Sequence, residues 1–374
     1  MKNASAGLPV SFALVGCGSI APTQVKALQG LPGEARLLCC CDEVPGRAEK
    51  LAAEFGLGTI GWEALLADPE IDAVTVCLPS GLHARLGAEA LAAGKHVMVE
   101  KPMDVSVGAC DALAGAALAA GRLLGVISQH RFDPASQLVQ GKIARGELGR
   151  VILADVRIPW YRTQEYYDSG DWRGTWELDG GGCLMNQGIH TLDLMLWLCG
   201  PVKSVYAQMR TAAHERIEVE DVVSATLTFA NGAIGSLVAS TSTYPGFAAR
   251  IEVSGTGGTA IIEGDELHTL AIKGRETLSG GHATAHALQV ATGGTKSAVS
   301  HAAAAPVPGA GSGAGDGAGS DWVWGDAHRA QFRDFIRAIR TGGRPLVDAA
   351  AGRAAVQLVN AVYASARSGA VVSL

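Results

Sequence analysis

Several patterns that define other classes of protein are missing from this 374-residue sequence. No stretch approaches the run of about 18 apolar residues that a membrane-spanning helix needs, so we expect no membrane partner. The eight cysteines form no C-x-x-C pair. Cys39–Cys41 alternate between the faces of an expected strand, which cannot supply a tetrahedral metal site. We therefore expect buried thiols, a reducing cytoplasm and no bound metal.

Charged residues are few, and the net charge of the chain is slightly negative. Charged residues make up 18% of the chain and the formal net charge is −6, which argues against nonspecific binding to nucleic acid or to a membrane surface. An anionic small-molecule partner is compatible with this balance, because it needs only a local basic pocket. Residues 1–9 contain one lysine and no apolar core, so we expect no secretory signal. The length and a hydrophobic content of 48% predict two globular domains.

Strand-like and helix-like segments alternate up to about residue 145, which predicts a doubly wound parallel sheet. The first apolar segment, 10–15, leads into Gly16-Cys17-Gly18-Ser19-Ile20-Ala21, the G-x-G-x-x-A form of the dinucleotide fingerprint. Gly16 permits the tight turn, Gly18 lets a pyrophosphate approach the backbone, and Ala21 lets the helix pack on the strand. N–H groups at the helix start then face the phosphates, so the predicted cofactor contacts are Gly16, Gly18, Ser19 and Ile20.

A second predicted strand, 37–41, ends at Asp42. The acid that binds a ribose hydroxyl is expected roughly 20 residues after the fingerprint, and a loop at Pro32-Gly33 accounts for the slightly longer spacing. Asp42 can accept a hydrogen bond from the ribose 2′-OH and would repel a 2′-phosphate. NAD is therefore the predicted cofactor, although Arg47 leaves NADP as an alternative.

Polar residues follow two further predicted strands. The apolar run at 97–99 ends in Glu100-Lys101-Pro102, at the carboxyl end where parallel sheets bind ligands. A lysine amine is costly to desolvate without a purpose, so we predict that Lys101 is catalytic. The neighbouring strand, 72–78, ends before Pro79, Ser80 and His83. We expect these three residues and Glu100 beside the cofactor, with His83 in a structural or cofactor-adjacent role.

A histidine with polar neighbours occurs later, in a segment of helical periodicity at 185–198. Asn186 and His190 are four residues apart and share one helix face, and Asp193 follows within reach. The preceding Gly180–Gly182 run would let a ligand approach the start of this helix. Histidine titrates near neutral pH, so His190 is the second predicted catalytic residue and Asn186 a predicted substrate contact.

Together, the fingerprint, Asp42, the Glu-Lys-Pro motif and the Gly180–Asp193 segment resemble the glucose–fructose oxidoreductase/inositol dehydrogenase/rhizopine-catabolism (Gfo/Idh/MocA) family, from Ser11 to the C-terminal helices. The resemblance implies a Rossmann domain followed by an α+β domain whose open sheet forms a homodimer or homotetramer. It also implies that Lys101 and His190 lie beside the nicotinamide and the substrate hydroxyl. Many members have Asp where this chain has Asn186, so a carboxylate-assisted base is not expected here.

A narrower resemblance rests on Trp160–Asp168 and Trp172–Glu177. These segments are similar to UDP-N-acetylglucosaminuronate 3-dehydrogenases, which also have Asn at the position of Asn186. Aromatic rings stack on uracil or sugar faces, and Arg pairs with phosphate or carboxylate. The predicted substrate contacts are Tyr161, Arg162, Tyr166 and Tyr167, together with Lys101, Asn186 and His190. The same aromatic residues are also typical of subunit interfaces or of a core.

Beyond about residue 150 the pattern changes to consecutive strands, which predicts an α+β domain with a large, mostly antiparallel open sheet. We expect strands at 151–159, 202–210, 222–229, 234–241 and 251–254, with a hairpin at Asn231-Gly232. The predicted domains are 1–130 and 131–374, with C-terminal helices at 322–340 and 349–367 packing back. Residues 280–320 are rich in Gly, Ala, Ser and Thr, so we expect a flexible insertion without a role in chemistry.

The resulting hypothesis is an NAD-dependent sugar dehydrogenase that transfers hydride from a ring carbon, C3 of a UDP-linked N-acetylhexosaminuronate, to nicotinamide. Either Lys101 or His190 can take the hydroxyl proton. Dehydrogenation of inositol or of a free sugar needs the same two groups and is an alternative. A cofactor-retaining cycle without NAD release is a second alternative. A nonenzymatic sugar-sensing regulator is the alternative of a different class, and the presence of both catalytic residues argues against it.

Overall fold

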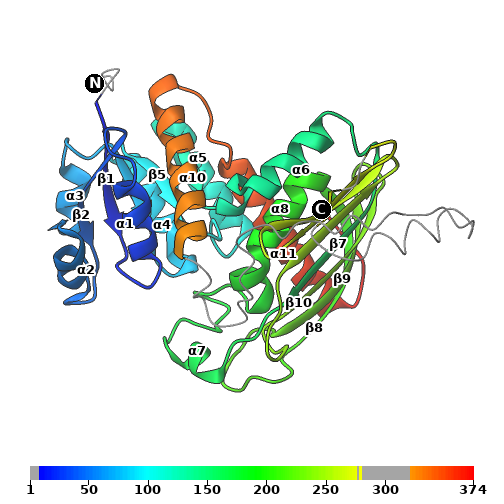
Figure 1. Cartoon of the computed structure of the whole chain (residues 1–374). Helices are drawn as coiled ribbons and strands as arrows, with labels where there is room; N and C mark the ends of the chain where they lie inside the picture. Colours follow the sequence, from blue (N-terminus) through cyan, green and yellow to red (C-terminus); the bar gives the residue numbers. More distant parts are fainter. Residues whose placement is uncertain (1–7, 276–277, 280–320) are drawn as a thin grey trace, which may run out of the picture.

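The computed structural model describes residues 8–275, 278–279 and 321–374. Its two β-sheets lie at opposite ends of the molecule and have helices between them (Figure 1). The predicted insertion at 280–320 lies outside the described residues, so its role stays a prediction. No helix in the described part of the chain is long and apolar enough to cross a membrane.

The first sheet has six parallel strands in the order β3-β2-β1-β4-β5-β6. This is the order of a dinucleotide-binding sheet, and it confirms the predicted doubly wound fold. The central strands are short apolar runs that are buried on both faces, as helices on either side require. The strands are β1 (Val10–Val15), β2 (Ala35–Cys41), β3 (Gly58–Thr59), β4 (Ala73–Val76), β5 (His96–Val99) and β6 (Leu124–Val126).

Helices connect these strands, and their ends follow local signals. In the fifth helix, Ser106 caps the N-terminus by accepting a hydrogen bond from the Ala109 N–H at 3.2 Å, and Gly121 ends the helix in a left-handed conformation. The helices of this part are α1 (Ala21–Gln29), α2 (Arg47–Phe55), α3 (Trp62–Ala67), α4 (His83–Ala92) and α5 (Val107–Ala120). The segments that lead to the second sheet are η2 (Gln129–Phe132) and α6 (Pro134–Ala144).

The second sheet has nine strands in the order β14-β13-β12-β11-β7-β10-β9-β8-β15. It is antiparallel except for the pairing of β7 with β10, which confirms a mostly antiparallel sheet. The predicted bounds of β7, β8 and β9 are confirmed. They could be predicted because buried and exposed residues largely alternate along these strands. The strands are β7 (Val151–Pro159), β8 (Val202–Arg210), β9 (Val222–Phe229), β10 (Ile234–Ser240), β11 (Arg250–Gly255), β12 (Gly258–Glu263), β13 (Glu266–Ile272), β14 (Leu278–Ser279) and β15 (Val372–Ser373).

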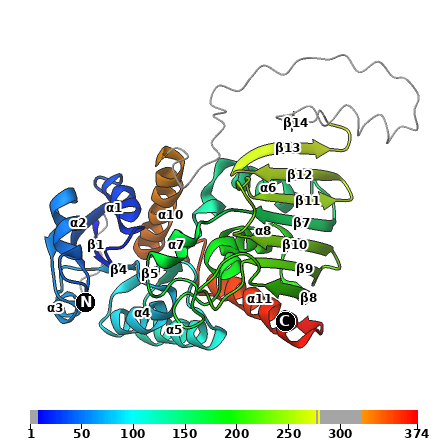
Figure 2. The ribbon, with the colours of Figure 1, turned by 90° about the horizontal axis from the view of Figure 1, so that it is seen from below.

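One face of the large sheet is covered and faces the first domain. Helix α6, α8 (Ile189–Cys199) and α11 (Ala349–Ser368) pack on it (Figure 2). The other face carries exposed Tyr206, Ile234 and Val238. The expectation that copies of the chain associate through this open face stays a prediction.

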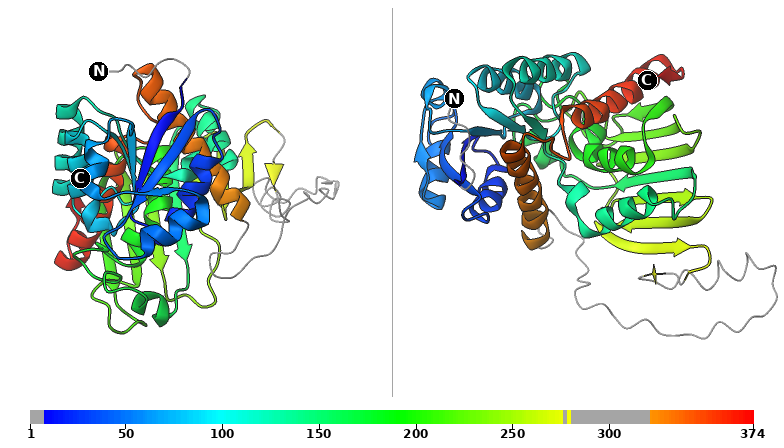
Figure 3. Two further views of the ribbon diagram at one scale, coloured as in Figure 1. Left: turned by 90° about the vertical axis from the view of Figure 1, so that its left-hand side faces the viewer. Right: turned by 90° about the horizontal axis from the view of Figure 1, so that it is seen from above.

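The two C-terminal helices pack on the rest of the chain. Helix α10 (Asp321–Thr341) lies against α1 of the first domain (Figure 3). There, Phe332 meets Phe12 of β1 edge to face, with ring centroids 5.8 Å apart. Helix α11 instead bridges α5 and α8. The predicted division at residues 130/131 stays a prediction, since α10 joins the first domain from the far end of the chain.

Candidate active site

The carboxyl ends of β1, β2, β4 and β5 meet at one edge of the first sheet. The loops there carry the fingerprint, Asp42, the Pro79-Ser80 pair and Lys101. Parallel pairing alone brings them together, since all four strands run in the same direction. The structure therefore gathers at one edge the cofactor and catalytic residues that were predicted from separate parts of the first domain.

The glycine loop fits a pyrophosphate. Gly16 has φ +89°, and a side chain there would meet the Cys77 carbonyl oxygen at 2.4 Å, so only glycine is accommodated. A side chain on Gly18 would meet nothing within 4 Å, which leaves its outer side open to a ligand. Ser19 is exposed and Ile20 is half-buried, and helix α1 begins directly after them. The exposed loop at the start of a nine-residue helix can receive phosphate.

Asp42 stands at the end of β2 and holds this loop in place. One carboxylate oxygen accepts the Cys17 N–H at 2.7 Å and the other accepts the Val44 N–H at 2.8 Å. Each oxygen keeps a further lone pair, and the side chain is only half-buried. Asp42 therefore keeps acceptor capacity, and its contact with a ribose hydroxyl stays a prediction.

The side chains of two predicted cofactor contacts turn inward, and their place beside the cofactor stays a prediction. The Glu100 carboxylate is 5% exposed and accepts from Gln24 of α1 at 2.5 Å and from the Lys101 N–H at 3.1 Å. His83 is fully buried, with Nδ1 2.7 Å from the Pro102 carbonyl and Nε2 2.9 Å from the Leu78 carbonyl. Both side chains are hydrogen-bonded within the protein, where they help to shape the loops at this edge of the sheet.

Lys101 follows β5 and points toward the second domain. Its Nζ donates to the Asn186 carbonyl oxygen at 2.8 Å. Burial lowers the pKa of Lys101, while the carboxylates of Glu100 and Asp179 oppose that shift. The ammonium is thus held where the two domains meet, in surroundings that weaken its hold on its proton.

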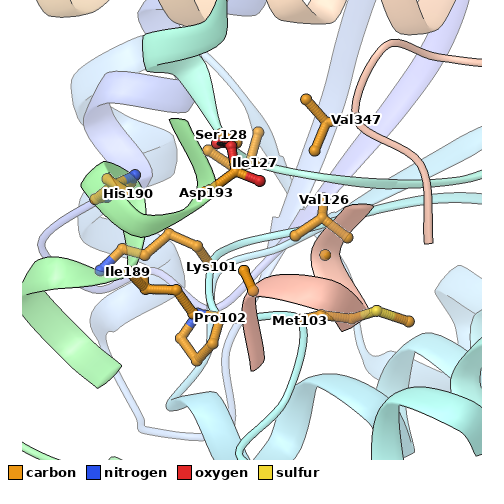
Figure 4. Close-up of a pocket in the computed structure, with 12 residues that line it drawn as sticks. Lys101, Pro102, Met103, Val126, Ile127, Ser128, Ile189, His190, Asp193 and Val347 are labelled. Carbon is orange, nitrogen blue, oxygen red and sulfur yellow. Dashed lines mark hydrogen bonds between the residues drawn. The ribbon is translucent and has the colours of Figure 1, made fainter. Parts of the chain in front are cut away.

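His190 faces the same cavity as Lys101. The cavity is small, with a volume of about 10 Å³, and is otherwise lined mainly by apolar side chains (Figure 4). His190 is 8% exposed, and its Nδ1 has no hydrogen-bond partner among the described residues. Burial lowers its pKa well below the ordinary value, and the charges of Lys101, His130 and His328 add to the effect. The imidazole is therefore neutral at physiological pH and able to accept a proton.

The backbone before His190 is irregular. Residues Cys183–Gly188 form a π-helical segment (η3) that leads into α8, a feature often found at functional sites. The prediction that the Gly180–Gly182 run admits a ligand is wrong, because buried Glu220 occupies that space. Its carboxylate accepts the Gly182 N–H at 3.0 Å and the Leu184 N–H at 2.9 Å. A side chain on Gly182 would meet the Glu220 carbonyl oxygen at 2.0 Å.

Asp193 does not assist His190, although helical spacing suggested contact. Its carboxylate pairs with the Arg131 guanidinium through two bonds of 2.6 and 2.7 Å and also accepts from the Ser128 hydroxyl. Both side chains of the ion pair are nearly buried. A buried guanidinium needs a counter-charge more strongly than the neutral imidazole does, so the carboxylate turns toward Arg131.

A histidine that we did not single out is the aromatic neighbour of His190. The His130 ring meets the His190 ring edge to face, with centroids 5.2 Å apart. Its Nδ1 lies 2.8 Å from Asp133 and 3.1 Å from Asp265. Burial alone would lower the pKa of His130, but these two carboxylates raise it to about 10. The three groups also have the spacing of metal ligands, yet their direct hydrogen bonds pair them without an ion. Asp265 comes from the β12–β13 turn, so local sequence gave no signal for this cluster.

Arginine and aromatic side chains form a connected cluster in the loop between β7 and α8. Arg162 donates to the Gln187 side-chain oxygen at 2.9 Å and lies over the Trp160 and Tyr166 rings at 5.5 Å each. Arg173 donates to the Tyr166 hydroxyl at 2.6 Å and lies over the same ring at 4.4 Å. Two cations and an aromatic face therefore converge beside Asn186-Gln187, next to the backbone that binds Lys101.

The side chains of two predicted substrate contacts, Tyr161 and Tyr167, form no hydrogen bond with this cluster in the described part of the chain. Tyr167 is 4% exposed and its hydroxyl is 2.8 Å from the Thr241 hydroxyl, so it packs in the core, and its role as a substrate contact stays a prediction. The Tyr161 ring is 36% exposed and meets Tyr244 edge to face at 5.3 Å. Within the segment 160–168, Trp160, Arg162 and Tyr166 therefore belong to the cluster, whereas Tyr161 and Tyr167 do not.

Comparison with known proteins identifies the family. Residues 10–128 match the oxidoreductase family with an NAD-binding Rossmann fold, and residues 136–261 match the GFO/IDH/MocA C-terminal domain. The chain belongs to the Gfo/Idh/MocA family of oxidoreductases. It is an NAD-dependent oxidoreductase that acts on CH–OH groups, as the match to the NAD-binding domain and its dehydrogenase relatives show.

Relatives with different substrates are similar to this Gfo/Idh/MocA protein. The scyllo-inositol 2-dehydrogenase (NAD(+)) of Bacillus subtilis is 31% identical over 260 residues, which cover 68% of this chain and 73% of the relative. The inositol 2-dehydrogenase of Rhizobium meliloti is 30% identical over 263 residues, covering 68% and 76%. The WlbA dehydrogenase from Bordetella pertussis, solved with NADH and UDP-GlcNAcA, is 31% identical with a TM-score of 0.82 over 98% of each chain.

The cofactor preference can be tested at Asp42. We expect the wild-type protein to bind NAD more tightly than NADP, and Asp42→Ala to weaken NAD binding roughly 10- to 100-fold, because a hydrogen bond to a charged group is lost. The measurement is fluorescence titration with NADH and NADPH. Glu54→Ala, which removes an exposed carboxylate from α2, is the matched control. Equal or tighter NADPH binding by the wild type would contradict the assignment.

Proposed function

We propose that this dehydrogenase oxidises the hydroxyl at ring carbon C3 of a UDP-linked N-acetylhexosaminuronate. The observation that carries the proposal is that the Lys101 site and the arginine–aromatic cluster are joined through Asn186 and Gln187. Lys101 binds the Asn186 carbonyl, and the next residue, Gln187, binds Arg162. A reacting hydroxyl at Lys101 and an anionic group at Arg162 and Arg173 would therefore lie on one continuous surface.

NAD, when bound, supplies the acceptor for the hydride that leaves the carbinol carbon. The chain has two groups that can take the hydroxyl proton. Neutral His190 is a buried acceptor with no described partner at Nδ1. Lys101 can instead lower the hydroxyl pKa as an ammonium, or accept the proton itself, since burial has lowered its own pKa. The mainly apolar lining of the cavity restricts water around both groups.

The arginine–aromatic cluster is suited to a nucleotide sugar acid. Guanidinium groups bind carboxylate or diphosphate through paired N–H donors, and aromatic faces stack on uracil or sugar rings. Arg162 and Arg173 are both half-buried, so a bound anion would be partly shielded from water and held more strongly. The WlbA structure with NADH and UDP-GlcNAcA supports this substrate class.

A second candidate is a dehydrogenase for inositol or another uncharged polyol. It is favoured by the identity to two inositol dehydrogenases over more than two thirds of each. An uncharged ring needs no convergence of Arg162 and Arg173, and this is why we place the nucleotide sugar acid first.

Arg162→Ala should lower apparent affinity for the nucleotide sugar acid roughly 30-fold or more, because a charged contact is removed from a partly buried site. The expected signature is a raised KM with kcat less affected, measured by NADH absorbance. Arg85→Ala is the control, since Arg85 forms an exposed pair with Glu89 on α4 and such pairs contribute little. An unchanged KM for Arg162→Ala would remove this residue from the substrate site.

The direct test of the reaction is incubation of the purified protein with NAD and UDP-N-acetylglucosaminuronate. We expect NADH to form in equal amount to a product whose new carbonyl is located at C3 by NMR. Oxidation at another ring position would retain the enzyme class but reject the assigned carbon. No NADH formation would reject the substrate.

A further inference from the structure

Asp179 is a buried carboxylate that no motif singled out. It is 1% exposed and lies in the loop before the three-glycine run. Its Oδ2 accepts the Gly174 N–H at 2.8 Å, and its Oδ1 accepts from the Asn186 side-chain amide. Burial raises its pKa, while these hydrogen bonds and the charges of Lys101 and Arg173 oppose that rise. These partners offset part of the desolvation cost of the buried carboxylate.

Asp179 determines which way the Asn186 amide points. An ionised carboxylate can only accept, so the Asn186 NH₂ group must face it and the Asn186 Oδ1 must face the other way. That oxygen accepts from the Gln187 Nε2 at 3.1 Å. Gln187 is also within 2.7 Å of the Tyr166 hydroxyl. Asp179 is therefore linked through consecutive hydrogen bonds, by way of Asn186 and Gln187, to the arginine–aromatic cluster.

Asp179 also acts on Lys101 through charge. The Lys101 ammonium donates to the backbone carbonyl of the same Asn186 whose side chain Asp179 holds. Asp179 and Glu100 are the two carboxylates that favour the charged form of Lys101, and Arg173 and Arg162 disfavour it. Glu100 is already engaged by Gln24 and the Lys101 N–H. Asp179 is thus the carboxylate that connects the reacting amine with the substrate-binding cations.

We propose that Asp179 is a positioning residue that fixes the Asn186 amide and balances the Lys101 charge, so that both present their groups to the substrate hydroxyl. The inference rests on the proposed function, and it supplies from loop 174–182 the carboxylate that the sequence led us not to expect. Because Asp179 acts through Asn186 and Lys101, its removal should change chemistry and pH dependence more than it changes cofactor binding.

The test compares Asp179→Asn with the exchange variant Asp179→Asn/Asn186→Asp. In the single variant, the new side-chain amide has one acceptor oxygen for two donors, the Gly174 N–H and the Asn186 amide, so we expect a fall in kcat on the order of 10- to 100-fold through misplacement of reacting groups. The exchange variant restores an acceptor–donor pair and keeps the negative charge beside Lys101, so it should recover most of kcat. Asp171→Asn, at an exposed carboxylate three residues before that loop, is the control and should match the wild type.

The pH readout separates positioning from simple structural damage. Loss of the Asp179 charge lowers the pKa of Lys101, so the limb of the kcat/KM profile that depends on Lys101 should move to lower pH. Competitive acetylation of lysines, read by mass spectrometry, should show the same shift at Lys101 without requiring turnover. NADH affinity should stay within about two-fold of wild type, consistent with additivity of separate sites.

The outcomes are distinguishable from those of the proposed function. Each variant is assayed with whichever substrate of the uronate, inositol and free-hexose panel the wild type oxidises fastest, so a wrong substrate leaves this test intact. A wild-type kcat and an unmoved acetylation profile in Asp179→Asn would overturn the inference. Failure of the exchange variant to recover kcat, despite a normal circular dichroism spectrum and NADH binding, would also overturn it.

Discussion

Lys101→Met should abolish measurable turnover while leaving NADH binding nearly intact. Methionine keeps most of the side-chain length but removes the ammonium that donates to the Asn186 carbonyl oxygen at 2.8 Å. A positioned acid, base or electrostatic group contributes about 100- to 10,000-fold to rate, and we expect a loss at the upper end because charge and proton transfer are removed together. The measurement is kcat from NADH absorbance alongside a fluorescence titration of NADH.

A matched control is Lys50→Met on α2, where the lysine is exposed and remote in sequence from the active-site motifs. Lys101→Arg distinguishes the two roles of the lysine. Arginine keeps a positive charge but does not act as a base, so partial recovery indicates electrostatic assistance and no recovery indicates proton transfer by the lysine itself. Retention of most of the wild-type kcat in Lys101→Met would remove Lys101 from the chemistry.

His190→Gln should lower kcat by about 100- to 10,000-fold if the imidazole takes the hydroxyl proton. Burial, with Lys101, His130 and His328 nearby, lowers the pKa of His190 well below its ordinary value. The group is therefore unprotonated through neutral pH, and the acidic limb that it causes should lie below about pH 6.5, the pKa of an ordinary histidine. The measurement is the pH profile of kcat/KM for both proteins.

The control for this substitution is His268→Gln, at a partly exposed histidine in β13 that is bonded to neighbouring Thr269. It should leave the profile unchanged. An acidic limb at or above pH 6.5 that disappears in His190→Gln would show that the histidine is not held in a neutral state. A wild-type kcat in His190→Gln would exclude it as the base and leave Lys101 in that role.

Local patterns predicted the first domain well because each signal lies within a few residues. The fingerprint needs a strand, a tight turn and a helix in succession, and β1, the Gly16 turn and α1 follow one another in that way. Strands β7, β8 and β9 were predicted to the residue because one face of each is buried and the other exposed. The parallel pairing of β7 with β10 was not predicted, since these strands are far apart in sequence, with α8, β8 and β9 among the elements between them.

The candidate site could be predicted only in part. Lys101 and His190 stand in motifs, but their surroundings depend on residues distant in sequence. Asp265 reaches His130 across 135 positions, and buried Glu220 fills the space beside Gly182. Helical spacing alone favoured Asp193 as the partner of His190, but the Asp193 carboxylate binds the Arg131 guanidinium instead. Tyr167 lies within an aromatic motif, yet burial against Thr241 removed it from the surface.

The central claim is that one site joins the Lys101–His190 chemistry to recognition of an anionic nucleotide sugar. The most direct test is kcat/KM with NAD for UDP-N-acetylglucosaminuronate, UDP-N-acetylglucosamine, myo-inositol and free hexoses under identical conditions. We expect the uronate to be oxidised fastest, with UDP-N-acetylglucosamine slower because it lacks the carboxylate that an arginine would bind. Faster NADH formation with inositol or with a free hexose than with the uronate would contradict the claim.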